Sequence, residues 1–88
     1  MKAYETMTAI SNFGVNVKGR TYTVTVASDP QRGGYSAKLK ATGLGVIMEP
    51  NGTSPSDALT RLVRELQDFG DKPLAKEIAK YAWFPLKV

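Results

Sequence analysis

Apolar residues alternate with polar ones in the first half of the chain and recur at helical spacing in the second half. Alternation with a period of two is typical of strands that bury one face. Spacings of three and four residues are typical of an amphipathic helix. The change of period falls at residues 51–59. The pattern therefore predicts a sheet followed by helices.

The strand period occurs at residues 13–17, 21–26, 35–40 and 44–49. The apolar positions are Phe13, Val15 and Val17, then Tyr22, Val24 and Val26, then Tyr35, Ala37 and Leu39, and finally Leu44, Val46 and Met48. Short breaks and a turn-rich stretch at residues 29–34 separate these segments, which predicts hairpins. The opposite face carries Thr21, Thr23, Thr25, Lys38 and Lys40. That face is polar enough to meet water.

The junction at residues 51–59 carries turn and helix-start signals. Asn51-Gly52 is a turn dipeptide, because both residues tolerate positive φ. Ser54 is a good N-cap, and Pro55 suits the first helical position, where its missing N–H costs nothing. Asp57, three residues after the cap, is expected to accept a hydrogen bond from the backbone N–H of Ser54.

Two helices are predicted after this junction. The first spans about residues 55–69, and Gly70 is its expected C′ residue. Its apolar stripe consists of Ala58, Leu59, Leu62, Val63, Leu66 and Phe69. The second runs from Asp71-Lys72-Pro73 to about Ala82. Its apolar side is Leu74, Ala75, Ile78, Ala79 and Ala82, and Lys72, Lys76 and Lys80 form a basic stripe. Such a stripe is usually a solvated face.

The expected fold class is α+β, in two layers and in ββββαα order. An antiparallel sheet of three or four strands would pack against one long helix and a second C-terminal helix. The 88 residues form one small domain. Residues 1–12 read as a flexible arm or a short edge segment. Residues 83–88 form an apolar tail.

The composition excludes several chemistries. The chain has no cysteine and no histidine, which removes disulfides, thiolate catalysis and the commonest general base. No run approaches the roughly 18 apolar residues of a membrane span, so a cytoplasmic protein with no membrane association is expected. Residues 1–40 hold six basic and two acidic residues, whereas residues 41–88 hold six of each. The strand half is therefore the basic half, which suits solubility or an anionic partner.

No catalytic, metal or cofactor site is expected. The serines at the helix start have no histidine or lysine in a nucleophile pattern, and capping explains them. Gly33-Gly34 precedes a strand rather than a helix, so it reads as a hairpin turn and not a phosphate loop. Asp29, Glu49 and Asp57 each lie at a turn or a helix start, where an acid has a structural role. The chain is not expected to be an enzyme.

Basic residues of the strand half are candidates for nucleic-acid binding. They are Arg20, Arg32, Lys38 and Lys40. Two readings stay open: a solvated face, or a face that binds a polyanion. Tyr22 and Tyr35 would not stack bases there, because the alternation places both on the apolar side. The strand–helix outline with basic charge also resembles a double-stranded-RNA-binding domain.

The apolar tail holds candidate partner-binding residues, namely Trp83, Phe84 and Leu86. It either packs back on the small core or serves as an aromatic anchor for a partner protein or a homodimer. Open sheet edges at residues 13–17 or 44–48 would supply main-chain hydrogen bonds to a docked strand.

Two motifs resemble those of the HicB-like antitoxin family. Residues 29–37, D-P-Q-R-G-G-Y-S-A, look like its D-P-x-x-G-G-Y-x-A hairpin. Residues 52–59, G-T-S-P-S-D-A-L, look like its G-[DT]-[TS]-P-x-[ED]-A-L helix start. The resemblance covers about residues 22–70 and implies a truncated ribonuclease-H-like fold. Only residues 71–88 follow, so the family's C-terminal DNA-binding domain is not expected.

The resemblance implies a function. Family members neutralise a small ribonuclease toxin of double-stranded-RNA-binding fold by covering its active surface. This chain would accordingly be a non-enzymatic protein-binding module that needs no cofactor. The alternatives are a small basic nucleic-acid-binding protein and a phage-encoded inhibitor of a host complex.

Overall fold

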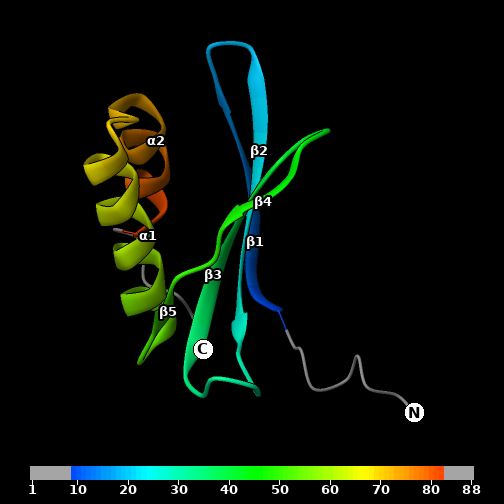
Figure 1. The fold of residues 1–88 in the computed structure, drawn as a ribbon, viewed down its shortest axis with the longest axis vertical. Coiled ribbons are helices and arrows are strands. Elements are labelled where there is room, and N and C mark those ends of the chain that lie inside the picture. The colour runs from blue at the N-terminus through cyan, green and yellow to red at the C-terminus, as the bar shows by residue number, and fades with distance from the viewer. Residues whose placement is uncertain (1–8, 83–88) are drawn as a thin grey trace.

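A computed structural model describes residues 9–82 of the chain, and Figure 1 shows their arrangement in two layers. The elements are β1 (Ala9–Val17), β2 (Arg20–Ser28), β3 (Tyr35–Ala41), β4 (Gly45–Met48), β5 (Asn51–Gly52), α1 (Pro55–Phe69) and α2 (Lys72–Ala82). The strands form one antiparallel sheet, and both helices lie on one side of it. The predicted two-layer α+β class in ββββαα order is confirmed, with the short β5 as an addition.

The sheet order is β1-β2-β3-β4, so β1 and β4 are the outer strands, and β5 pairs with the start of β3. Positive φ angles at Lys18 (53°) and Gly19 (76°) form the tight turn between β1 and β2. This is the conformation that suits the twist of a two-residue hairpin. β1 begins at Ala9 and pairs with β2. Residues 1–12 were interpreted as either a flexible arm or a short edge segment. Within that range, residues 9–12 belong to an edge strand.

The pairing of β3 with β4 contains a register shift, and this shift changes which face the residues of β4 occupy. Met48 lies opposite Leu39 of the core, but Val46 lies opposite Lys40. An extra residue at a bulge reverses the alternation beyond it. Leu44, Val46 and Met48 were expected to share one apolar face. That expectation is wrong for Val46, which lies on the polar side with Lys40.

The segment Asn51–Gly52 is a strand rather than the predicted turn. Gly52 lies opposite Tyr35 and Asn51 opposite Ser36, and neither Asn51 nor Gly52 has a positive φ. Gly52 is required for a different reason, which is space. A Cβ there would collide with the backbone of Ala58 in the first turn of α1. The glycine allows the helix to approach the sheet closely.

The ends of α1 follow the capping signals of the sequence. The Ser54 hydroxyl accepts a hydrogen bond from the Asp57 N–H at 3.0 Å, and Gly70 ends the helix with φ 95° and a bond to the Gln67 carbonyl. The carboxylate of Asp57, however, accepts from the Thr53 N–H at 2.9 Å. The sequence predicted the Ser54 N–H as the donor to this carboxylate, so that prediction is wrong by one residue.

The second helix starts close to the predicted residue. The Asp71 carboxylate accepts a hydrogen bond from the Leu74 N–H at 3.3 Å. An acid at this position satisfies one of the free N–H groups at a helix start. Neither helix in residues 9–82 is long and apolar enough to cross a membrane.

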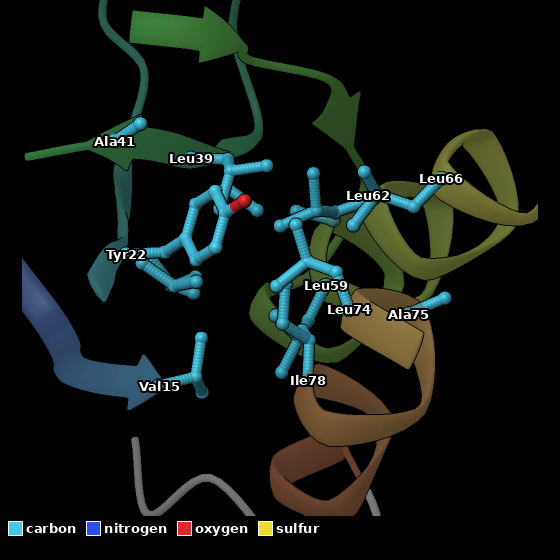
Figure 2. Packing of buried hydrophobic residues seen from close by; sticks show 14 residues of the cluster. Val15, Tyr22, Leu39, Ala41, Leu59, Leu62, Leu66, Leu74, Ala75 and Ile78 are labelled. Atoms are coloured by element: carbon cyan, nitrogen blue, oxygen red, sulfur yellow. The ribbon is translucent and has the colours of Figure 1, made fainter. Parts of the chain in front are cut away.

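The core lies between the sheet and the two helices. Figure 2 shows side chains from three strands pointing toward those of both helices. Its largest fully buried members are Leu39, Leu59, Leu62, Leu74, Ile78, Val24 and Val26. Phe13 of β1 stacks on Tyr81 of α2, with ring centroids 3.9 Å apart, and so ties the outer strand to the second helix. Phe69 was predicted in the apolar stripe of α1, but it is the last residue of the helix and is 79% exposed.

The close contact at Gly52 leads to a stability prediction. We expect Gly52→Ala to lower the free energy of unfolding by about 1–3 kcal/mol, because the new methyl group would push α1 away from β5. Gly14→Ala is the matched control. Its Cβ would meet nothing nearer than the Tyr22 carbonyl oxygen at 3.6 Å. Urea unfolding followed by circular dichroism measures both, and equal stabilities of the two variants would contradict the prediction.

Candidate functional site

The face of the sheet away from the helices is polar along its middle strands. Cross-strand register places Thr25 opposite Lys38 and Thr23 opposite Lys40. Across the other edge of β2, Asn12 lies opposite Thr25. Paired residues share a face of the sheet, so these five side chains lie on one surface. We call it the open face.

A hollow of about 510 Å³ lies on the open face. It is lined by Asn12, Thr23, Thr25, Lys38, Lys40, Ala41, Thr42 and Gly43. The lining comes from β1, β2, β3 and the turn that follows β3. Amide, hydroxyl and ammonium groups can all donate hydrogen bonds. The hollow therefore suits an anion or a group rich in acceptors.

The sheet itself contains no acidic residue. No Asp or Glu occurs in β1, β2, β3 or β4, whose charged residues are Arg20, Lys38 and Lys40. Neither lysine forms an ion pair within residues 9–82, where the ion pairs involve Arg32, Arg61 and Lys80. The positive charge of the open face is therefore not neutralised by neighbours in the described part of the chain.

The structure brings together two of the four cationic candidates for nucleic-acid binding. Lys38 and Lys40 both line the hollow. Arg20 lies at the start of β2, and the alternation places it on the same side of the strand as Tyr22. Arg32 lies in the turn between β2 and β3. The four residues do not form one surface.

Arg32 has a structural role in its turn. Its Nε donates to the Asp29 carboxylate at 2.7 Å, and its Nη2 donates to the Glu49 carbonyl oxygen at 3.0 Å. The Asn51 amide adds a bond of 2.7 Å to the Gly33 carbonyl oxygen. These contacts join the D-P-x-x-G-G turn to the segment before α1. The two motifs of the family resemblance are therefore neighbours in space.

Two of the three carboxylates considered for a metal, those of Asp29 and Asp57, are occupied by local contacts. Hydrogen bonds from Arg32 hold the pKa of Asp29 below its usual value. The bond from the Arg32 backbone N–H has the larger effect, and the bond from its side chain adds to it. The pKa of Asp57 is also lowered, mainly by the hydrogen bond from the Thr53 N–H and then by the bond from the Arg61 side chain. Glu49 contributes its backbone carbonyl to Arg32. Residues 9–82 contain no group of three or more metal-ligating side chains.

The turn between β3 and β4, together with β4, exposes aliphatic side chains. Leu44 is 70% exposed, Val46 53% and Ile47 43%. β4 is an outer strand, and this hairpin projects away from the helices in Figure 1. We call residues 42–48 the apolar hairpin. Apolar side chains on an uncovered strand are typical of a pairing surface.

The aromatic rings of the described residues do not line the hollow. Tyr22 belongs to the core, and Tyr35 is half-buried against it, as the alternation predicts. Phe13 and Tyr81 also pack against the core. The hollow therefore has no described ring on which a nucleic-acid base could stack.

The remaining candidates lie away from the hollow. Lys72, Lys76 and Lys80 are exposed along α2, and Lys80 pairs with Glu77 at 2.9 Å. The predicted partner-binding residues Trp83, Phe84 and Leu86 lie outside the described residues.

Sequence reasoning missed part of the hollow. Asn12 lies in the segment interpreted as a flexible arm or a short edge segment, and Thr42 and Gly43 fall in the short break between two predicted strands. The signal that could have found Asn12 is its spacing from Asn16, which continues the polar side of β1.

Comparison with known proteins adds no identification. No family model matches the chain. No curated protein matches it, and no solved structure matches its fold.

The contacts of Asp29 predict how stability changes with pH. A carboxyl group whose pKa is lowered by folding stabilises the protein above its unfolded pKa, and this stabilisation is lost as the pH falls through the folded pKa. Asp29→Asn should therefore be less stable than the wild type at neutral pH. The difference should shrink as the pH falls below the ordinary value of 3.8.

Urea unfolding of both proteins between about pH 7 and pH 2 measures this difference. Asp68→Asn, which removes an exposed carboxylate from α1, controls for the loss of one negative charge. A stability difference between Asp29→Asn and the wild type that stays constant with pH would falsify the assignment.

Proposed function

We propose that this chain is a non-enzymatic protein-binding module and that a partner protein docks on the apolar hairpin. One observation carries the proposal. Three of the four large apolar side chains that are exposed in residues 11–81 are Leu44, Val46 and Ile47. They lie within four residues of one another, on or beside an outer strand. Exposed aliphatic residues are normal when scattered, but a group of them at one place marks an interaction site.

Strand addition is the docking mode that this edge supports. The outer side of β4 presents backbone N–H and C=O groups, and an added strand would pair with them. Such a strand would also cover Val46 and Ile47, which removes apolar area from water. The other outer strand, β1, offers a longer edge, but its exposed side chains include Asn12 and Asn16. The edge at β4 combines open main-chain groups with apolar side chains.

The resemblance to HicB-like antitoxins supports a small ribonuclease as the partner. Members of that family cover the active surface of a small ribonuclease. The first motif is bonded through Arg32 and Asn51 to the residues just before the second motif, and Tyr35 of the first pairs with Gly52 of the second, so the two motifs form one structural unit at the sheet. We propose that the partner is a small ribonuclease and that docking blocks its access to RNA.

The docking surface can be tested with two variants of equal character. The double variant Val46→Thr, Ile47→Thr should lose at least about tenfold in affinity for the partner, because two apolar contacts become polar. Phe69→Ser removes an exposed apolar side chain at the end of α1 and should bind as the wild type does.

The measurement has two stages. Tagged wild-type protein first captures the partner from its own cells, and titration calorimetry of the purified pair then compares the variants. Equal binding by the double variant and the wild type would exclude the apolar hairpin. Failure of the wild type to capture any specific protein would contradict the proposal that the chain is a protein-binding module.

The antitoxin part of the proposal has a separate test. The captured partner should cleave RNA, and an equimolar amount of the wild-type protein should suppress that cleavage. The double variant should suppress it only at higher concentration. A partner with no ribonuclease activity would overturn the antitoxin assignment and favour an inhibitor of a host complex, while the docking surface would stand on the binding data.

A further inference from the structure

The open face carries an array of hydrogen-bond donors that the docking of a protein on the apolar hairpin does not use. In one row across the sheet, Asn12, Thr25 and Lys38 are cross-strand neighbours. In the next row, Thr23 and Lys40 are neighbours. Adjacent strands lie about 4.8 Å apart, and residues two positions apart along a strand lie about 7 Å apart. The donors are thus spread over an extended surface rather than gathered at one point.

From this array we infer that the open face binds the phosphate backbone of double-stranded nucleic acid without reading its sequence. The inference goes beyond the proposed function and concerns the polar side chains of the open face, which borders the apolar hairpin at Thr42 and Gly43. Three features of the molecule support it, and they concern charge, hydrogen-bonding groups and the absence of rings.

The first feature is the sign of the charge. Among the described strand residues, the charged side chains on the open face are Lys38 and Lys40, and β1–β4 contain no acid to oppose them. Neither lysine has an ion-pair partner in the part of the chain that the structure describes. Each lysine is thus available to replace a counterion on a phosphate, which is the main source of affinity in such complexes.

The second feature is the kind of donor around the lysines. Threonine hydroxyls and an asparagine amide surround Lys38 and Lys40 in the hollow. Lysine, threonine and asparagine are common partners of phosphate and sugar oxygens. An acidic peptide would also meet the charge. A backbone of regularly spaced phosphates makes better use of hydroxyl and amide donors spread over three strands, because it offers acceptors along its whole length.

The third feature is the absence of an aromatic platform. No described aromatic ring lines the hollow, since Tyr22 and Tyr35 belong to the core side. Proteins that bind single strands rely on stacking of bases on such rings. A surface of cations and small polar groups fits a duplex, whose bases are already stacked and whose phosphates lie outside.

The experiment measures the salt dependence of binding. Fluorescence anisotropy would follow binding of labelled 30-base-pair duplexes of RNA and of DNA, each in two unrelated sequences, over a range of salt concentrations. The wild type should bind both sequences of one duplex type with equal affinity. The slope of log K against log salt is negative for such complexes. In the double variant Lys38→Gln, Lys40→Gln, the magnitude of this slope should be smaller by about 2, because two phosphate contacts are lost.

A control variant with the same change of charge keeps this test specific. Lys72→Gln, Lys76→Gln removes two exposed lysines from α2 and should keep the wild-type slope. Circular dichroism would first verify that both variants fold. Binding to the RNA duplex, to the DNA duplex or to both would support the inference and identify the duplex.

Three results would overturn it. One is an unchanged slope in the variant that lacks Lys38 and Lys40. Another is equal or tighter binding of a single strand of the same length. The third is equally tight, equally lysine-dependent binding of polyglutamate, which would point to an acidic peptide. None of these results affects the docking test at the apolar hairpin, so the two proposals can fail separately.

Discussion

The close approach of α1 to the sheet at Gly52 is the constraint on which the arrangement of the layers depends. A side chain there would collide with the backbone of Ala58. The Ser54 hydroxyl and the Asp57 carboxylate satisfy N–H groups around the helix start. Leu59 and Leu62 then reach the sheet and become fully buried. The helix layer is thus positioned at its first turn, and the core follows from that position.

Because both helices cover the same side of the sheet, neither covers the polar side chains on the other side. The core takes Val24, Val26 and Leu39, while Thr23, Thr25 and Lys40 on the same strands line the hollow. Successive side chains of a strand point to opposite faces of the sheet, so every residue that faces the core is followed by one that faces the other side. A chain that builds its core this way also builds the open face.

The two proposed surfaces have different physical origins. The open face is polar because the alternating pattern makes it so. In the apolar hairpin, the register shift between Leu39 and Lys40 places Val46 opposite a lysine, while Met48 stays opposite Leu39. One surface could therefore be anticipated from the pattern of the sequence. The other depends on an irregularity in strand pairing.

Several predictions followed closely from local chemistry. The bounds of α1, the Ser54 cap and the left-handed Gly70 depend on residues three or four positions apart, so the sequence contains all the information they need. The partner of Asp57 was wrong by one residue within the same turn, whereas two other failed predictions concern how an element meets the rest of the fold. Asn51–Gly52 has turn chemistry, but pairing with Ser36 and Tyr35 makes it a strand. Phe69 fits the helical stripe, but at the last residue of α1 the described structure leaves it 79% exposed.

The sequence alone determined the period of each element, its caps, the fold class and the basic character of the strand half, because each is a property of near neighbours or of composition. Only the tertiary structure decided which candidate residues act together. It brought Asn12 and Thr42 to Lys38 and Lys40 in the hollow, and it committed Arg32 to Asp29 and Glu49 instead. The physical reason is strand register, which depends on how segments far apart in the chain pair and which no single segment encodes.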